Sequence, residues 1–484
     1  MEFNSFAFLI FFLLFYVLYW FVFNKNVKGQ NLFLLIGSYL FYAWWDWRFL
    51  SVLIFSSVVN YLLAINISKT EDERRKSILV YIALLQGLGG LLFFKYYNFF
   101  VTSLVDSFSS IGISLNLSTL NIILPLGISF YTFKTISYIL DVNNERIEPT
   151  QNWIVFFSYV SYFPSLLAGP IDKARDFIPQ LEKKREPNYS YGLDGLRQIL
   201  WGLFKKVVIA DNCITIVNEI FGSYEILPGS TLLLGAFLNI IQIYADFSGY
   251  SDMAIGFSKL LGIQITKNFN YPFFAKNIAE FWQRWHMSLT TWMTEYVYTP
   301  LSFIFRDYGK WGTILAILIN FILVGFWHGS NWTFAVFGLL HGLYFIPLIL
   351  SGTMNKRPSP TSNDLLPSRT DFFKIVKTFT LVALTGVIFT TPTITDAVMY
   401  YKKMFSISFF SMPVFPLGIF LTLKIVALVL IMFVVEWMER NQDFPLHHFG
   451  IDWNKTLRRS FYYLLIIIII AFMGKEQEFI YFKF

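Results

Sequence analysis

The chain has 484 residues, of which 55% are hydrophobic, 20% aromatic and 14% charged, and its mean hydropathy is +0.54. Because soluble globular proteins carry about a quarter charged residues, this composition predicts a polytopic membrane protein. The net charge of +7 gathers in a few loops without forming a basic face for nucleic acid, and the single cysteine, Cys213, excludes an intramolecular disulfide and a cysteine-based metal cluster.

Apolar runs of about twenty residues, the length that crosses a membrane as a helix, recur along the chain. The first run follows Met-Glu-Phe-Asn-Ser without a basic region or a cleavage motif, so we interpret it as a retained helix rather than a signal peptide. The spacing predicts roughly eleven or twelve transmembrane helices in one all-α membrane domain over residues 1–484, without internal repeats. The runs lie at 6–23, 31–46, 49–66, 78–97, 120–140, 196–221, 231–262, 312–327, 333–350, 373–391, 415–436 and 459–473.

The basic residues of the loops orient these helices, because cytoplasmic loops carry an excess of Lys and Arg. Loops 24–30 and 68–77 are basic and are expected in the cytoplasm, whereas the short turn at 46–48 and loop 101–119, which lacks Lys and Arg, are expected outside. This alternation places the N-terminus outside. Further cytoplasmic loops are expected at 352–372, with Lys356, Arg357 and Arg369, and at 437–459.

One apolar segment interrupts the alternation. Residues 153–169 lie between Arg146 and a strongly basic loop, so both flanks are expected in the cytoplasm. Pro164, Gly169 and Pro170 break the helical hydrogen bonding, and non-helical backbone at membrane depth persists only where protein or a water-filled cavity covers it. The segment is therefore predicted to be re-entrant beside a cavity; a short kinked span with one misassigned loop is the alternative.

His328 is an ionisable residue at the end of an apolar span, in GFWHGSNW (325–332). In the expected orientation the span reaches His328 toward the outer half of the membrane, where such groups usually face a cavity or a partner. Gly325 and Gly329 let a backbone or a substrate approach closely, and a neutral imidazole accepts a proton from a hydroxyl near neutral pH. A histidine that only hydrogen-bonds between helices remains open. His341, between Gly338 and Gly342, is interpreted as structural, because small residues favour close helix packing.

His286 and Arg284 lie in an aromatic stretch, EFWQRWHMSLTTWM (280–293), whose basic neighbours indicate the cytoplasmic interface. An interfacial amphipathic helix is one interpretation. The other is that the Arg–His pair binds a cytosolic donor that carries phosphate or a carbonyl group. On a continuous helix one face would hold Phe281, Trp285, Ser288 and Trp292.

Asp246 and Asp252 are carboxylates in the apolar run 231–262, and buried carboxylates need hydrogen-bond donors. They are candidates to hold the Arg and His side chains described above. Cys213 is interpreted as a packing residue rather than an acyl carrier. The sequence contains no GxSxG elbow, HExxH or phosphate-binding loop, and no metal site is expected.

Several long stretches resemble the membrane-bound O-acyltransferase family, and within it the bacterial branch that O-acetylates alginate. The resemblance extends over nearly the whole chain and is weakest between 352 and 460. It implies a ring of helices with re-entrant segments around a tunnel that crosses the membrane. The stretches are YADFSGYSDMAIG (244–256), NFNYPFFAKNIAEFWQRWHMSLTTWM (268–293), GFWHGSNWTFAVFGLLHG (325–342), LPLGISFYTFKTISYILDV (124–142), YFPSLLAGPIDKARDFIPQL (162–181) and EFIYFKF (478–484).

The resemblance implies that the protein lies in the inner membrane of a bacterium and transfers an acyl group across this membrane. His328 matches the essential family histidine and is expected to act as general base, while His286 matches the second histidine, nearer the cytosol. Acetyl-CoA or another acyl thioester is the implied co-substrate, and no bound cofactor is expected. The implied acceptor is an extracytoplasmic polysaccharide, reached through a partner of the SGNH-hydrolase type; relatives acylate alginate, peptidoglycan, cellulose or teichoic acid. Residues expected to bind the donor or line the tunnel are Arg284, Trp285, Trp327 and Asn331, with Asp246 and Asp252 beside them in a structural or supporting role.

Two other classes of function remain open. A transporter or flippase also places polar groups and broken helices at the midplane, although it usually shows internal repeats. A non-catalytic scaffold of an exopolysaccharide export complex is the other.

Overall fold

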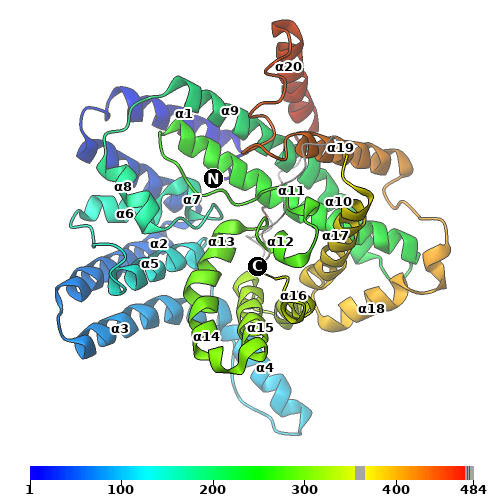
Figure 1. Ribbon diagram of the computed structural model, residues 1–484, viewed down its shortest axis with the longest axis horizontal. Coiled ribbons are helices and arrows are strands. Elements are labelled where there is room, and N and C mark those ends of the chain that lie inside the picture. Colours follow the sequence, from blue (N-terminus) through cyan, green and yellow to red (C-terminus); the bar gives the residue numbers. More distant parts are fainter. Residues whose placement is uncertain (355–365, 475–476, 478, 480–484) are drawn as a thin grey trace. The chain divides into compact units, whose positions relative to one another are not determined.

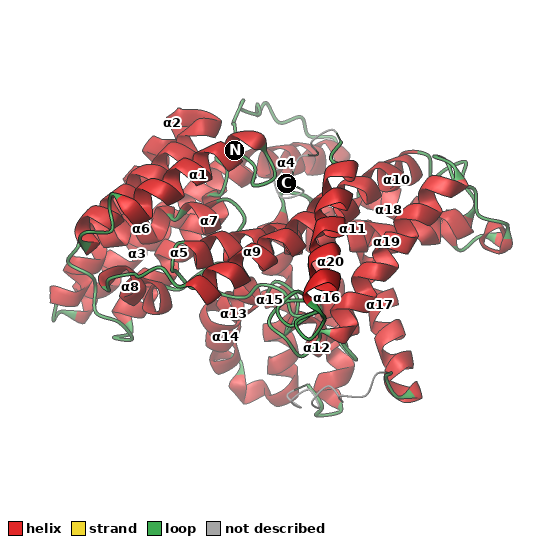
Figure 2. Ribbon diagram, turned by 90° about the horizontal axis from the view of Figure 1, so that it is seen from above, coloured by secondary structure: helices red, strands yellow, loops and turns green. Residues whose placement is uncertain are grey.

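The computed structural model describes residues 1–354, 366–474, 477 and 479 (Figure 1). Within these residues the regular elements are all helices and no strand is present, which confirms the all-α prediction (Figure 2). The chain forms two compact units, Met1–Leu193 with Phe257–Thr266, and Asp194–Gly256 with Lys267–Phe484. A single membrane domain over 1–484 stays a prediction. Lys356 and Arg357 of the predicted cytoplasmic loop, and the stretch 478–484 apart from Phe479, lie outside the described residues.

The first unit is built from apolar helices, several of which begin at a polar capping residue. Asn26 and Asp72 begin helices by accepting a hydrogen bond from Gly29 and Arg74 backbone N–H groups, respectively. The helices are α1 (Phe6–Phe21), α2 (Val27–Lys69), α3 (Glu73–Leu91), α4 (Tyr97–Ser110), α5 (Ile128–Asn143), α6 (Trp153–Ser161), α7 (Phe163–Leu166) and α8 (Ala174–Glu182), with a π-helix at Leu92–Tyr96.

Two buried cations of the first unit donate hydrogen bonds to neutral side chains. Arg185 is buried and donates to the side-chain oxygen of Asn31 at 2.6 Å, and its guanidinium lies over the ring of Tyr19. Lys134 is buried as well and donates to the hydroxyl of Ser165 at 2.8 Å. Because a buried cation without partners is costly, these contacts fix α5 against α7, and the loop after α8 against α1 and α2.

The predicted re-entrant segment 153–169 is broken where the sequence indicates. Its first helix, α6, has nine residues, about 14 Å, and is too short to cross a bilayer core of about 30 Å. Tyr162 leaves the helical conformation, and the four-residue α7 follows with Pro164 in its first turn. Gly127, with φ +73°, packs against the carbonyl of Leu166, where a Cβ atom would clash. The break is confirmed, and its re-entry into the membrane stays a prediction.

The second unit holds the residues that the sequence analysis assigns to the site. Its helices are α10 (Asp211–Gly222), α12 (Ile278–Trp282), α13 (Met287–Met293), α14 (Thr299–Ile304), α15 (Gly309–His328), α16 (Trp332–Leu350), α17 (Arg369–Thr390), α18 (Ile394–Met404), α19 (Ile419–Met438) and α20 (Lys455–Phe472). Two helices contribute to both units, α9 (Tyr189–Leu203) and α11 (Gly229–Leu260). Shorter elements are π-helices at Phe204–Ala210 and Thr294–Tyr298 and 3-10 turns at Pro272–Phe274, Arg306–Tyr308 and Ile407–Phe410.

Seven helical segments of the described residues are long and apolar enough to cross a membrane, fewer than the eleven or twelve predicted. One reason is that α2 covers two predicted spans, 31–46 and 49–66, and is interrupted only at Asp46, which has φ −157° and ψ 109°. Other predicted spans correspond to helices that are short, such as the 16-residue α1 and α5, or that carry several charges, such as α20. The seven are Val27–Lys69, Glu73–Ser110, Gly229–Leu260, Arg306–His328, Trp332–Leu350, Arg369–Thr390 and Ile419–Met438.

Helices α15 and α16 pack closely through glycine, as the sequence indicates. A Cβ atom on Gly325 would clash with the carbonyl of Phe334, and one on Gly338 with the carbonyl of Phe321. Small residues at these positions let the two backbones touch. The close approach holds the end of α15, and with it His328, against the first turns of α16.

Candidate active site

His328 is the last residue of α15 and is 3% exposed. Its ring is enclosed by aromatic side chains, with centroid distances of 5.0 Å to Trp327, 5.2 Å to Phe389 and 6.1 Å to Phe337. These rings come from α15, α16 and α17. The imidazole is therefore positioned by three helices in an almost water-free environment.

A small cavity lies beside His328, with about 390 Å³ of empty space including the part at its mouth. Its walls are predominantly aliphatic and aromatic, and imidazole rings are contributed by His328 and His341. Apolar walls with a few converging polar groups are typical of small-molecule sites. The lining residues are Ile240, Ile243, Phe281, Trp282, Trp285, His328, Phe337, His341, Val382, Gly386 and Phe389.

The stretch 280–293 is not a continuous helix, so the amphipathic face considered above is wrong. α12 ends at Trp282, α13 begins at Met287, and His286 between them has φ +43° and ψ 52°. Backbone hydrogen bonds clamp this turn from the preceding loop: the N–H of Asn270 donates to Arg284 at 2.9 Å, and that of Met287 to Asn268 at 2.8 Å. Left-handed backbone is strained for a histidine, and such strain often marks functional sites.

His286 is fully buried, and its hydrogen bond defines its tautomer. Its Nδ1 lies 2.9 Å from the side-chain oxygen of Asn268. That oxygen also accepts from the hydroxyl of Ser288 at 2.9 Å, so Nδ1 donates and Nε2 carries the lone pair. Burial, and secondly the charge of His328, lower the pKa of His286 well below its usual value. The ring in this turn is thus neutral.

Replacing Asn268 by Ala is expected to lower the free energy of unfolding by about 1–3 kcal/mol, because His286 and Ser288 would lose a buried acceptor. Thermal unfolding of the detergent-solubilised protein measures this change. Asn66→Ala serves as the control, because Asn66 is exposed. An unfolding midpoint equal to that of Asn66→Ala would contradict the clamp described here.

His286 and His328 lie close to each other, whereas the sequence predicts that they lie toward opposite sides of the membrane. Ring centroids are 5.4 Å apart for His286 and Trp327, and 5.0 Å apart for Trp327 and His328. The two imidazoles are therefore separated by no more than the sum of these distances, well below a bilayer core of about 30 Å. The basic neighbours of the turn at 283–286 predict a position at the cytoplasmic membrane interface, whereas the structure buries this turn inside the second unit.

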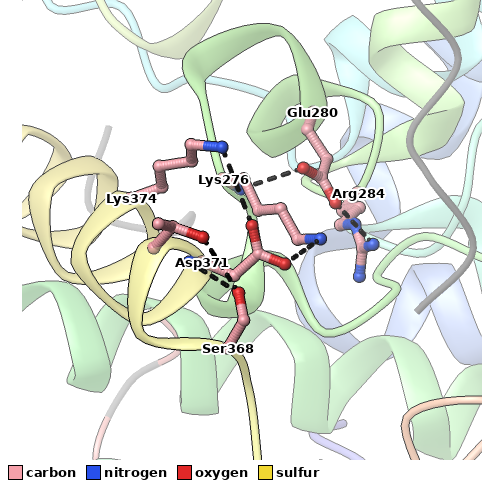
Figure 3. Close-up of polar contacts among 7 residues, drawn as sticks. Lys276, Glu280, Arg284, Ser368, Asp371 and Lys374 are labelled. Carbon is pink, nitrogen blue, oxygen red and sulfur yellow. Dashed lines mark hydrogen bonds and ion pairs between the residues drawn. The ribbon is translucent and has the colours of Figure 1, made fainter. Parts of the chain in front are cut away.

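Arg284 binds Glu280 at 2.6 Å and does not line the cavity of His328. The other oxygen of Glu280 accepts from the backbone N–H of Lys276, whose ammonium group binds Asp371 at 2.8 Å (Figure 3). Lys374 approaches the same carboxylate at 3.7 Å. This polar network ties the start of α12 to the first turn of α17.

A second and larger hollow lies on this polar side, with about 1630 Å³ including the space at its mouth. We call it the lysine groove, because Lys276, Lys374 and Lys377 line it. The helices α12, α16 and α17 line both the groove and the cavity, and along α17 residues 371–381 face the groove while residues 382–389 face the cavity. From Lys377 to Gly386 the helix rises about 14 Å. The two hollows thus follow one another along the same helices.

Asp246 and Asp252 hold lysines, not the Arg or His side chains that the sequence analysis considered. Lys206 binds Asp246 at 2.8 Å, and Lys205 binds Asp252 at 2.6 Å. Lys206 also donates to the carbonyl of Gln477 at 3.1 Å. Sequence analysis missed both lysines, although two adjacent lysines in an apolar run were a usable signal.

The remaining candidates have separate places. Trp285 lines the cavity, and Trp327 lies between the two histidines without lining it. Asn331 caps α16, accepting from the N–H of Thr333 and donating to the carbonyl of Pro392, and it does not line the cavity. In the described part of the chain no cluster of three His, Cys, Asp or Glu side chains is arranged to hold a metal ion.

Comparison with known proteins connects this geometry to a family. Residues 144–363 match the model of the membrane-bound O-acyltransferase family. The chain is 37% identical to a probable alginate O-acetylase of Azotobacter vinelandii over 84% of this chain and 78% of the relative. It is 36% identical to a peptidoglycan O-acetyltransferase of Helicobacter pylori, over 66% and 64% of the two chains. A teichoic acid D-alanyltransferase of Bacillus subtilis is 30% identical over 46% of this chain and 58% of the relative.

Proposed function

The chain belongs to the membrane-bound O-acyltransferase family and is an integral membrane O-acyltransferase, and from this premise we propose that it moves a short acyl group, acetyl in particular, from a cytosolic thioester to an extracytoplasmic alcohol. The observation that carries the proposal is the buried imidazole of His328 on an apolar cavity, with the lysine groove next along the same three helices. Probable alginate O-acetylases among the relatives support acetyl as the group transferred.

The chemical step is acyl transfer with His328 as general base. His328 takes the proton of the acceptor hydroxyl as its oxygen attacks the thioester carbonyl and forms the new C–O bond. The C–S bond of the tetrahedral intermediate then breaks, and the thiolate leaves with a proton returned from the imidazolium. The apolar walls exclude water, which would otherwise compete as nucleophile.

The lysine groove is the proposed entrance of the donor. Lys276, Lys374 and Lys377 provide positive charge for phosphate, and the groove lies at the end of α17 that follows the expected cytoplasmic loop 352–372. A pantetheine arm that starts from phosphate in the groove would run along α16 and α17 toward His328. Acetyl-CoA and an acylated phosphopantetheine carrier share this chemistry, and both are candidate donors.

Purified protein in proteoliposomes tests the reaction, with radiolabelled acetyl-CoA on one side of the membrane and an oligosaccharide as hydroxyl acceptor on the other. Cleavage of the thioester, with release of the free thiol, is the expected result. Intact acetyl-CoA that only crosses the membrane would favour a transporter, and binding without cleavage a scaffold.

The small cavity is expected to limit acyl length. Ile243→Ala widens it and is expected to raise the butyryl-to-acetyl ratio of kcat/KM about tenfold, because a methylene group in an apolar pocket changes selectivity by at least that factor. Gly386→Ala is the matched opposite, since its added Cβ would meet Ile240 at an ordinary 3.7 Å and narrow the space. Thioester cleavage with acetyl-, propionyl- and butyryl-CoA measures the ratio. Identical ratios in both variants would show that the acyl group lies elsewhere.

The proposed acceptor is a polysaccharide outside the cytoplasmic membrane of a bacterium, reached through an extracytoplasmic partner of the SGNH-hydrolase type. Relatives with different polymers in their names, alginate, peptidoglycan and teichoic acid, support a cell-surface glycan or related polymer as the class.

A further inference from the structure

His341 is a second imidazole on the wall of the cavity and has no part in the transfer step described above. It is 1% exposed and lies in the middle of α16, where its ring contacts Phe337 at 4.6 Å. Phe337 contacts His328 as well, at 6.1 Å, and all three rings line the cavity. His341 and His328 therefore both contact one phenyl ring in a common wall.

The hydrogen bond of His341 determines which nitrogen carries its proton. The indole N–H of Trp282 donates to Nδ1 of His341 at 3.2 Å. An indole nitrogen is only a donor, so Nδ1 is the accepting nitrogen and the ring is neutral with its proton on Nε2. Nε2 is buried and has no hydrogen-bond partner among the described residues. His341, a residue of the cavity wall, thus carries an N–H group that no atom of the described residues satisfies.

A buried donor without a partner is rare, because its desolvation is not compensated. Among the described residues that line the cavity, His341 is the one with such an atom. The proposed reaction creates an oxyanion from the thioester carbonyl in the same apolar space, and a preorganised N–H group is the kind of donor that stabilises this charge.

We propose that the Nε2–H of His341 binds the carbonyl oxygen of the acyl thioester and stabilises the oxyanion formed when the alcohol attacks. This inference rests on the acyl transfer proposed above, and it makes His341 a catalytic residue rather than the structural histidine expected from its glycine neighbours. The indole of Trp282 orients the ring by fixing its tautomer.

A matched pair of substitutions separates the two hydrogen bonds of His341. The amide of Gln reaches the position of Nε2, so His341→Gln keeps a donor to the substrate and loses the acceptor of Trp282. The amide of Asn reaches only the position of Nδ1, so His341→Asn keeps the contact with Trp282 and loses the donor. Both are compared with the unaltered protein in nanodiscs, with an oligosaccharide as acceptor, by thiol release from acetyl-CoA and by the thermal midpoint.

His341→Asn is expected to lower kcat about 10²–10³-fold with KM for acetyl-CoA changed less than about threefold, and His341→Gln to retain activity within about tenfold. The opposite order, equal activity in both variants, or losses that follow the thermal midpoint would overturn the inference and leave His341 structural. His328→Ala, measured in parallel, tests the proposed function separately. If it is inactive while His341→Asn is fully active, only the role of His341 fails.

Discussion

Replacing His328 by Ala is expected to lower the rate of acetyl-CoA cleavage by a factor of about 10²–10⁴, the usual contribution of a general base. The imidazole is almost fully buried among three aromatic rings, which cannot accept a proton in its place. Removal of the ring from the end of α15 leaves the glycine contacts between α15 and α16 intact. The loss is therefore expected in kcat, with the protein still folded.

The control for this substitution is His448→Ala, which removes an exposed histidine of the loop after α19. It is expected to retain full activity. Equal expression and an equal elution volume for the two variants would show that both are folded. Unchanged thioester cleavage by His328→Ala would end its assignment as general base.

Replacing Lys206 by Met is expected to lower the free energy of unfolding by about 3–5 kcal/mol, the usual cost of breaking a buried ion pair from one side. Lys206 is 4% exposed and binds two carboxylates, Asp246 at 2.8 Å and Asp211 at 2.9 Å. Without the ammonium group both carboxylates lose this ion pair inside the second unit. Thermal unfolding in detergent measures the shift.

Two further variants identify the cause of this loss. The double variant Lys206→Met with Asp246→Asn also removes one of the two carboxylate charges that Lys206 binds, so it is expected to recover part of the stability. Lys25→Met changes an exposed lysine of the loop before α2 and is expected to be neutral. A midpoint for Lys206→Met equal to that of Lys25→Met would show that the pairs add no stability.

Hydrophobic periodicity and small residues predict the helices around His328 well. The run 312–327 corresponds to α15, and the glycines beside His328 and His341 correspond to real backbone contacts. These features are local or repeat along one helix, so a single sequence contains them. The family motifs cover the same region, which is why the comparison and the geometry agree there.

The turn at His286 could not be predicted from periodicity. Its course depends on hydrogen bonds with Asn268 and Asn270, which lie fewer than twenty residues earlier in the chain. These hydrogen bonds hold the segment in a non-helical turn. The tautomer of His341 in the cavity wall could not be predicted either, because it depends on a hydrogen bond from Trp282 of another helix. Long-range polar contacts override the local preference for helix in both places.

The buried charges show a further limit. Asp246 and Asp252 are recognisable as unusual in an apolar run, but their partners, Lys205 and Lys206, lie some forty residues away on a π-helix. An aspartate in a membrane helix indicates that a partner exists without identifying it. The choice of Arg or His as partner was wrong for this reason.

Inverted membrane vesicles test the central claim, acyl transfer across the membrane through His328, most directly. In these vesicles the cytosolic face of the membrane points outward, so radiolabelled acetyl-CoA is supplied only outside. Alkali-labile label, which indicates an acetyl ester, is then measured on macromolecules inside the vesicles. The expected result is luminal acetyl ester with the unaltered protein and none with His328→Ala. Equal luminal ester with both proteins, or no cleavage of acetyl-CoA by either, would contradict the account.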